Sequence, residues 1–152
     1  MVNTKVVFKE RSDKYADGVY ILKEVENDKP IRVGMSGSPE IRVMDHQMSN
    51  WREVHICYVI WTNQARWLEK LFHLEFHPRQ LNRDWFDMTW DEGIQGIKAL
   101  CNIYDFDVYR KYAWTDKPKS GISDLRYDTV KPLPTYNSVR MKHKIGSIHE
   151  VL

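Results

Sequence analysis

Three stretches of the chain are rich in β-branched and aromatic residues, and this pattern predicts three strands of a sheet. The stretches are residues 19–22, 31–33 and 55–61. Residues 26–30 are polar and end in a proline, which is the composition of a hairpin loop between the first two strands. Residues 6–8 are a candidate for the start of a further strand.

Three helices are predicted from an apolar spacing near 3.6 residues and from their end signals. A serine–proline pair at residues 38–39 suits a helix start, so a helix is expected over residues 39–49. A second amphipathic helix is expected over residues 63–77, because a proline follows directly. A capping box at residues 89–92 opens a third helix that continues through Leu100.

The predicted order is therefore β-β-α-β-α-α within residues 1–114, followed by an extension over residues 115–152. The whole chain of 152 residues has the length of one domain. The extension has no apolar period and holds three of the six prolines, so we expect it to be extended or partly disordered.

Charge is unevenly distributed along the chain. The net charge is +2, and the extension holds seven Lys or Arg residues against four Asp or Glu residues. A basic arm of this kind suits sequence-independent contacts with nucleic-acid phosphates. A solvated tail without a partner has the same composition.

Membrane and secreted classes are not expected. No apolar run approaches membrane-spanning length, and the N-terminus lacks a signal-peptide core. Cys57 and Cys101 lie in apolar stretches, which favours reduced core residues over a metal or disulfide framework. We therefore predict a cytoplasmic protein without a membrane partner, whose oligomeric state is left open.

The segment after the second predicted strand carries the most chemically active side chains. It runs from Gly34 through a polar turn into the helix that bears Arg42 and His46, which are four residues apart and share one face. The phenol of Tyr20 is expected on the neighbouring strand. Taken singly, Tyr20 fits a core position, and Arg42 and His46 fit a solvated helix face. Together, a cation, an imidazole and a phenol suit the binding of a phosphate group.

The order of these residues resembles the GIY-YIG nuclease superfamily. The tripeptides at residues 18–20 and 32–34 correspond to its two strand motifs, and an arginine and a histidine follow at the family's spacing. The family continues with a helix that bears one essential glutamate, and often with an asparagine, for which Glu69 and Asn82 are the candidates. The resemblance covers residues 18–89. It implies an α/β fold with a small three-stranded antiparallel sheet flanked by helices.

This resemblance implies a metal-dependent endonuclease that hydrolyses DNA phosphodiester bonds, in a phage or a restriction system, with RNA as an alternative substrate. Glu69 is expected to hold one Mg²⁺ or Mn²⁺ ion, since both cations prefer oxygen ligands. Arg42 is expected to bind a phosphate oxygen through two donors. Tyr20 is expected to activate water, with the metal, Arg42 or His46 shifting its proton.

The remaining implied residues contact substrate or support the glutamate. Asn82 is expected to hold Glu69 or the substrate backbone, although it also fits a turn. Arg32, Gly34 and Ser36 are the expected substrate-binding residues. Arg32 stands where the family has a tyrosine, and a guanidinium cannot take part in proton transfer. A catalytically weakened nucleic-acid-binding or regulatory module on the same fold is therefore the alternative function.

A zinc site is a second alternative for the predicted helix over residues 63–77. Glu69, His73 and His77 recur every four residues on one face, and a carboxylate with two imidazoles is a zinc-binding set. The gluzincin pattern requires a glutamate directly after the first histidine, where this chain has Leu74. We therefore favour the assignment of Glu69 to a single Mg²⁺ or Mn²⁺ ion.

Overall fold

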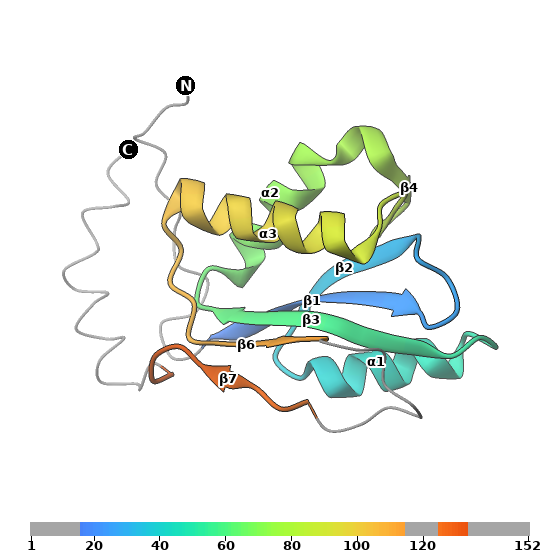
Figure 1. Ribbon diagram of the computed structural model, residues 1–152, viewed down its shortest axis with the longest axis horizontal. Coiled ribbons are helices and arrows are strands. Elements are labelled where there is room, and N and C mark those ends of the chain that lie inside the picture. Colours follow the sequence, from blue (N-terminus) through green and yellow to red (C-terminus); the bar gives the residue numbers. More distant parts are fainter. Residues whose placement is uncertain (1–15, 115–124, 134–152) are drawn as a thin grey trace.

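The computed structural model describes residues 16–114 and 125–133 and has one antiparallel sheet at its centre (Figure 1). The sheet has seven strands in the order β4-β5-β2-β1-β3-β6-β7. Their bounds are β1 Asp17–Glu24, β2 Ile31–Ser36, β3 Val54–Thr62, β4 Gln80–Asn82, β5 Trp85–Phe86, β6 Arg110–Ala113 and β7 Asp128–Thr129.

The prediction of a three-stranded sheet is wrong, because four short strands widen the sheet at its two edges. The three strands predicted from the sequence form its centre as β2-β1-β3. The hairpin β4-β5 continues the sheet beyond β2, and β6 with β7 continues it beyond β3. These additions pair backbone groups that a three-stranded sheet would leave open at its edges.

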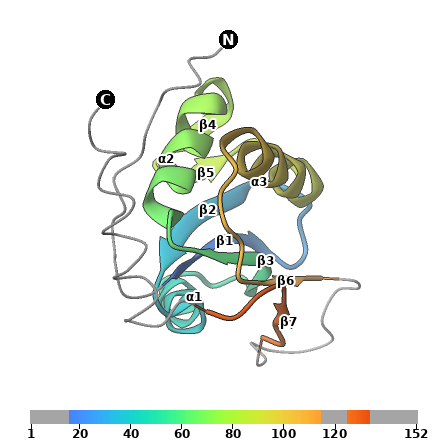
Figure 2. The same ribbon diagram turned by 90° about the vertical axis from the view of Figure 1, so that its left-hand side faces the viewer.

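Three α-helices cover the two faces of the sheet. They are α1 Pro39–Met48, α2 Ala65–Glu75 and α3 Trp90–Tyr104, and a 3₁₀ turn, η1 His77–Arg79, follows α2. Helices α2 and α3 lie on one face and α1 lies on the other, as both views show (Figures 1 and 2). All three α-helices were predicted from the sequence, but α2 is shorter at both ends than expected.

The helix ends are held by local hydrogen bonds. The predicted capping box of α3 is confirmed, with Glu92 N–H donating to Thr89 Oγ1 over 3.2 Å. At α1 the expected cap differs, because the Ser38 side chain makes no capping bond. Instead the Ser38 N–H donates to Ser36 Oγ over 2.9 Å, so Ser36 shapes the turn that leads into the helix.

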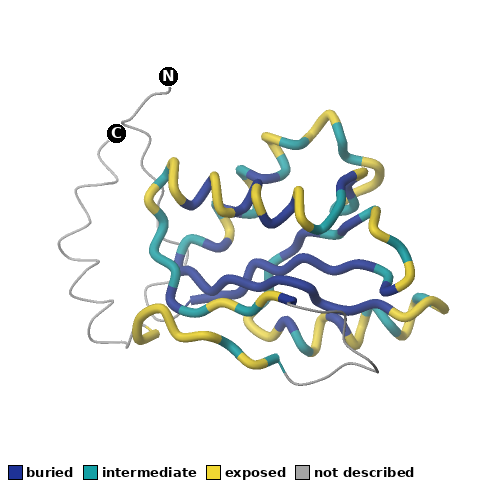
Figure 3. The backbone as a smooth tube through the Cα atoms, in the orientation of Figure 1, coloured by how far each residue is buried: buried dark blue, intermediate teal, exposed yellow. Residues whose placement is uncertain are grey.

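The sheet separates two apolar layers, and its central strands are buried along most of their length (Figure 3). The layer under α2 and α3 includes Val19, Ile21, Leu68, Phe72 and Ile97. The layer under α1 includes Tyr20, Leu22, Val43, Val59 and Trp61. Alternate residues of β1 therefore face opposite layers, as period-two alternation requires.

Residues 125–133 of the predicted extension lie against the sheet. The strand β7 pairs with β6, and the N–H groups of Val130 and Lys131 donate to the Tyr109 carbonyl over 2.8 and 3.0 Å. Tyr127 meets the edge of Trp61, with ring centroids 5.9 Å apart. This segment is thus packed, where an extended arm was expected.

The remaining predictions concern the cysteines, the ends of the chain and membrane-spanning helices. Cys57 and Cys101 are free and buried, as predicted. The candidate strand at residues 6–8 and the remainder of the extension lie outside the described residues, and the domain boundary at residue 114 stays a prediction. Within the described part of the chain, no helix is both long and apolar enough to cross a membrane.

Candidate functional site

The close approach of β1 and β2 brings Tyr20 directly over Gly34. The two residues are paired across the strands. A Cβ atom on Gly34 would lie 2.7 Å from the Tyr20 hydroxyl oxygen and 2.9 Å from its Cζ, so only glycine leaves room for the ring in this position. Tyr20 itself is 1% exposed and packs in the layer under α1.

The face of β2 that bears Gly34 also bears Arg32 and Ser36, because alternate residues of a strand share a face. Arg32 is largely buried, with 16% of its side chain exposed, and its Nη2 lies 2.8 Å from Asp84 Oδ2. Its Nε atom is also buried and has no hydrogen-bond partner among the described residues. The Arg32 cation is therefore held by Asp84, while its buried Nε–H group makes no hydrogen bond among the described residues.

Helix α1 supplies Arg42 and His46 on adjacent turns. Arg42 points to solvent and makes a loose ion pair with Asp45, with Nη1 3.7 Å from Oδ2. His46 is half-buried, and its Nε2 is buried without a hydrogen-bond partner within the ranges that the structure describes.

The electrostatic surroundings of His46 favour its neutral form. Burial lowers the pKa of His46 below 6.5, and the cations of Arg32 and Arg42 lower it further. The carboxylates of Asp45 and Asp84 oppose this shift only in part. At neutral pH His46 is thus an uncharged imidazole with a ring nitrogen available for a proton.

Helix α2 binds the edge of β2 where the neighbouring strand stops. The pairing of β5 with β2 ends at Arg32. Beyond it, the Val33 N–H donates to the Asp84 carbonyl over 3.0 Å, and His73 Nε2 donates to the Val33 carbonyl over 3.2 Å. The Met35 N–H then donates to the Glu69 carboxylate. Two side chains of α2 thus continue the hydrogen bonding of the missing strand.

This contact holds Glu69 in a partly desolvated position. Burial raises the pKa of Glu69 above 4.5, and the nearby Asp84 carboxylate raises it further. His73, the Met35 N–H and Arg32 act in the opposite direction. The position is therefore an unfavourable one for a carboxylate that has no cation bound to it.

Three of the predicted site residues share one electrostatic neighbourhood, although they come from different elements. The charge of Arg32 on β2 acts both on His46 of α1 and on Glu69 of α2. We call Arg32, His46 and Glu69 the edge cluster, because the charge of Arg32 influences both other residues and Arg32 lies on β2, whose edge is open beyond it.

Asp84 belongs to this neighbourhood and was not predicted. It pairs with Arg32, lies 3.8 Å from His73 Nε2 and influences both His46 and Glu69. In the sequence it is an ordinary acidic turn residue. Only the folding of the hairpin β4-β5 beside β2 brings it to the cluster, so no local pattern could have found it.

Two predicted site residues do not join the edge cluster by direct contact. Asn82 is exposed at the end of β4, and no hydrogen bond joins its amide to Glu69 in the described part of the chain. Ser36 uses its hydroxyl to accept the Ser38 N–H. Their expected roles toward Glu69 and substrate stay predictions.

The alternative zinc site does not fit the geometry. His73 donates to the Val33 carbonyl, and His77 lies beyond the end of α2, where its Nδ1 is 3.1 Å from Gln80 Oε1. Across residues 16–114 and 125–133, no group of three or more His, Cys, Asp or Glu side chains is arranged to hold a metal ion. The four-residue spacing is thus a feature of the sequence that the chain does not use for zinc.

Comparison with known proteins relates the chain to a domain family. The family model described as the T5orf172 domain matches residues 17–101. This range begins at β1 and ends within α3, so it includes the edge cluster and both flanking helices. No curated protein and no solved structure matches the chain.

Proposed function

Because this chain belongs to the T5orf172 domain family, whose members include phage and nuclease-like proteins, we propose that it is an endonuclease. Its substrate is DNA, with RNA as the alternative, and the reaction is hydrolysis of a phosphodiester bond by a set of residues like that of the GIY-YIG nucleases. The observation that carries the proposal is the edge cluster. A cation on β2 acts electrostatically on a neutral imidazole of α1 and on a carboxylate of α2.

The arginines bind the phosphate in this proposal. Arg42 is exposed and its pairing with Asp45 is loose, so its guanidinium is free to turn toward a phosphate oxygen. Arg32 lies deeper, and its unused Nε donor is a second candidate for the same group. These two positive charges offset the negative charge that develops on the non-bridging phosphate oxygens during attack.

His46 and Tyr20 handle the proton of the attacking water. As a neutral imidazole, His46 can accept a proton at Nε2 when the water oxygen attacks phosphorus and the bond to the 3′ oxygen breaks. Tyr20 stands over Gly34 on the same side of β2 as Arg32, where its hydroxyl can orient the water. The leaving 3′ oxygen takes its proton from solvent.

A divalent cation fits the position of Glu69. The raised pKa of this carboxyl reflects desolvation and the nearby Asp84 carboxylate, and both effects are relieved by a bound cation. Mg²⁺ is commonly held by one or two carboxylates together with waters and substrate phosphates, so Glu69 alone is a sufficient protein ligand. When bound, such an ion stabilises negative charge on the phosphate and the leaving oxygen.

The alternative function is a nucleic-acid-binding module without turnover. Two observations favour it specifically. Arg32 is committed to Asp84 at 2.8 Å, and Tyr20 is 1% exposed. A phosphate that cannot reach either residue would be bound through Arg42 but not cleaved.

A plasmid-nicking assay with and without Mg²⁺ separates the two functions. The full chain should nick supercoiled DNA only with the cation, and Glu69→Gln should lower the rate by about a hundredfold or more. Glu75→Gln, at the exposed end of the same helix, is the control that should keep activity. DNA binding measured by fluorescence anisotropy should survive in both variants. Binding without any nicking would favour the module.

Arg42→Lys tests the phosphate-binding role. The variant keeps the charge and loses the planar pair of donors, so cleavage should fall by about ten- to a hundredfold. Near-native cleavage by this variant would place Arg42 on the solvated surface.

A further inference from the structure

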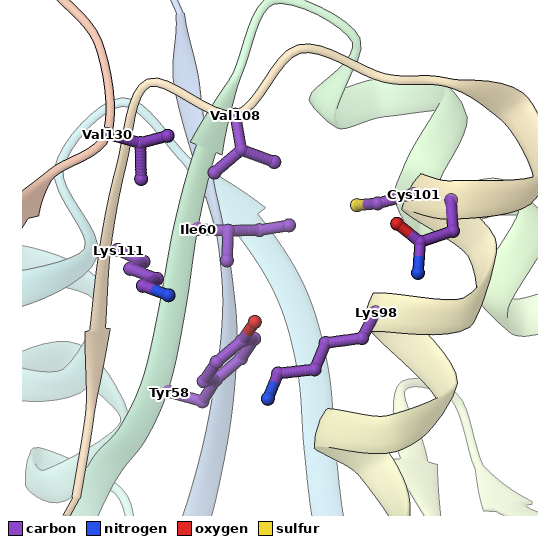
Figure 4. A pocket seen from close by; sticks show the side chains of 8 residues that line it. Tyr58, Ile60, Lys98, Cys101, Val108, Lys111 and Val130 are labelled. Atoms are coloured by element: carbon purple, nitrogen blue, oxygen red, sulfur yellow. The ribbon is translucent and has the colours of Figure 1, made fainter.

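A hollow lies on the face of the sheet opposite to α1. It is a pocket of about 280 Å³ between α3 and the neighbouring strands β3 and β6 (Figure 4). None of the edge-cluster residues lines it. The pocket is therefore separate from the proposed cleavage site.

The pocket is formed by one face of α3 and one face of the sheet. Lys98, Cys101 and Asn102 are spaced so that they share one face of α3. On the sheet, Ile60 of β3 is paired with Lys111 of β6, so their side chains lie on the same face and below the helix.

Two lysines project into the space from opposite sides. Figure 4 shows Lys98 reaching from α3 toward Tyr58, and Lys111 reaching into the pocket from β6. Asp128 is paired with Lys111 across β6 and β7, yet no carboxylate lies within ion-pair distance of either lysine in the described residues. Among residues 16–114 and 125–133, the two positive charges at the pocket therefore have no ion-pair partner.

The remaining lining is apolar with a few polar groups. Ile60, Val108 and Val130 form the apolar part, and the Tyr58 hydroxyl and the Asn102 amide add hydrogen-bonding groups. Burial raises the pKa of Tyr58, so its hydroxyl remains a neutral donor, and burial raises the pKa of Cys101 to about 12, so its thiol stays protonated. Such a combination is typical of a site for a small molecule with one charged end.

We infer that this pocket binds a small phosphate monoester with an aromatic or apolar body, with its phosphate between Lys98 and Lys111 and its body against Ile60, Val108 and Val130. Nucleoside 5′-monophosphates belong to this chemical class.

The charge and size of the pocket support a phosphate monoester. A phosphate monoester carries a charge of roughly −1.5 to −2 at neutral pH, which matches two ammonium groups, whereas a carboxylate leaves one lysine unneutralised. Lysine binds phosphate as a point charge and needs no planar partner. A volume of about 280 Å³ suits a single small molecule and not a nucleic-acid strand.

Binding is tested on the full chain with four probes. Thymidine 5′-monophosphate and phenyl phosphate carry both parts, thymidine lacks the phosphate, and inorganic phosphate lacks the body. Isothermal titration should give binding for the first two and at least about tenfold weaker binding for the last two. Amide shifts in a two-dimensional NMR spectrum should centre on Ile60, Lys98 and Lys111.

Lysine variants locate the site. Lys98→Ala and Lys111→Ala should each weaken the binding of thymidine 5′-monophosphate by about tenfold, because each removes one charge-assisted contact. Lys70→Ala, on the exposed surface of α2, is the control and should leave the affinity unchanged. All three positions are exposed, so the variants should fold, which their NMR spectra can verify.

Three results would each overturn the inference. The first is binding of thymidine or of inorganic phosphate as tight as that of the two monoesters, because the site would then not recognise both parts of the ligand. Absence of monophosphate binding at millimolar concentration also excludes the site. Binding that moves the amides of the edge cluster instead places the ligand at the proposed cleavage site, and this outcome leaves the nuclease proposal intact.

Discussion

Glu69 has a carboxylate whose negative charge the folded protein disfavours. Its pKa is raised by burial and by Asp84, so the folded state binds its proton more tightly than the unfolded state does. Its contribution to stability therefore falls as the pH rises from about 4.5 through the raised folded pKa. A functional carboxylate is expected to be placed in this way, at a cost in stability.

Glu69→Gln should therefore be at least as stable as the natural chain at pH 7. The amide oxygen of glutamine can still accept the Met35 N–H, while the desolvated charge is removed. Thermal unfolding should give an equal or higher Tm for the variant, and Glu26→Gln in an exposed loop should leave the Tm unchanged. A clear fall in Tm would mean that the charge of Glu69 stabilises the fold.

Arg32 should help to keep His46 unprotonated, in addition to burial, which is the largest cause of the lowered pKa of His46. Because the Arg32 cation lowers the pKa of His46, Arg32→Gln should raise that pKa toward 6.5. In the natural chain, stability should fall as the pH drops from 6.5 through the lowered folded pKa, since the unfolded state binds the proton first. The pH range over which stability falls should become narrower in Arg32→Gln.

An NMR titration of the His46 ring checks this prediction. Arg52→Gln, in the exposed loop after α1, is the control and should not move the titration. An unchanged His46 titration in Arg32→Gln would show that the two side chains do not interact, and the edge cluster would lose its central residue.

At the scale of elements, the sequence predicted the parts with strong patterns. The central strands and the three α-helices have enough residues for alternation or helical periodicity to show. The strands β4 to β7 have only two to four residues each, and several of these residues are polar. Such strands form because an edge is available to pair with, and this information is not local.

The same limit explains the candidate site. Tyr20, Arg42, His46 and Glu69 were found because a motif order links them along the chain. The role of His73 at the β2 edge and the presence of Asp84 depend on where β5 stops. No local sequence pattern indicates that a side chain will hydrogen-bond to a strand edge in place of a neighbouring strand.

The start of α3 is bound to the 3₁₀ turn η1 through Glu92. Arg79 Nη1 and Nη2 donate to its two carboxylate oxygens over 2.8 and 3.1 Å, and the Thr89 N–H donates to Oε1 over 3.0 Å. These bonds lower the pKa of Glu92 to about 2. Its stabilising contribution is present above about pH 4.5 and is lost as the pH falls toward 2.

Arg79→Ala should raise the pKa of Glu92 toward 4.5, because the Arg79 hydrogen bond is the largest cause of the shift. The pKa is measured by NMR titration of the side-chain carboxyl. Arg83→Ala, in the exposed turn of the nearby hairpin β4-β5, is the control and should leave the pKa of Glu92 low. An equally low value in Arg79→Ala would assign the shift to the capping box alone.

Tyr127 secures the outermost strand through the Arg110 side chain. The Arg110 guanidinium carbon lies 4.3 Å from the Trp61 ring centroid and 4.4 Å from that of Tyr127, so the cation lies between two aromatic faces. Tyr127→Ala should lower the unfolding free energy by about 2 kcal/mol. Tyr127→Phe keeps the ring and should stay close to the natural value. Urea unfolding compares the two, and equal stabilities would show that the ring contributes nothing.

For the whole molecule, the packed segment bears on where the folded domain ends. A chain ending at residue 133 keeps β7 and Tyr127, while a chain ending at residue 114 loses both. The shorter chain should be less stable by about 2 kcal/mol or more, since it loses an aromatic pair and a cation–π contact as well as strand pairing. Urea unfolding of the two truncated chains gives the difference. Equal stabilities would support a domain that ends at residue 114.

The position of β1 has a consequence for how the chain is made. It is the first strand along the described chain and also the middle strand of the sheet. Each later strand or hairpin joins an edge that already exists, with β2 and β3 on either side of β1, then β4-β5, then β6, then β7. A chain leaving the ribosome can therefore build the sheet outward in the order of synthesis, without separating strands that have already paired.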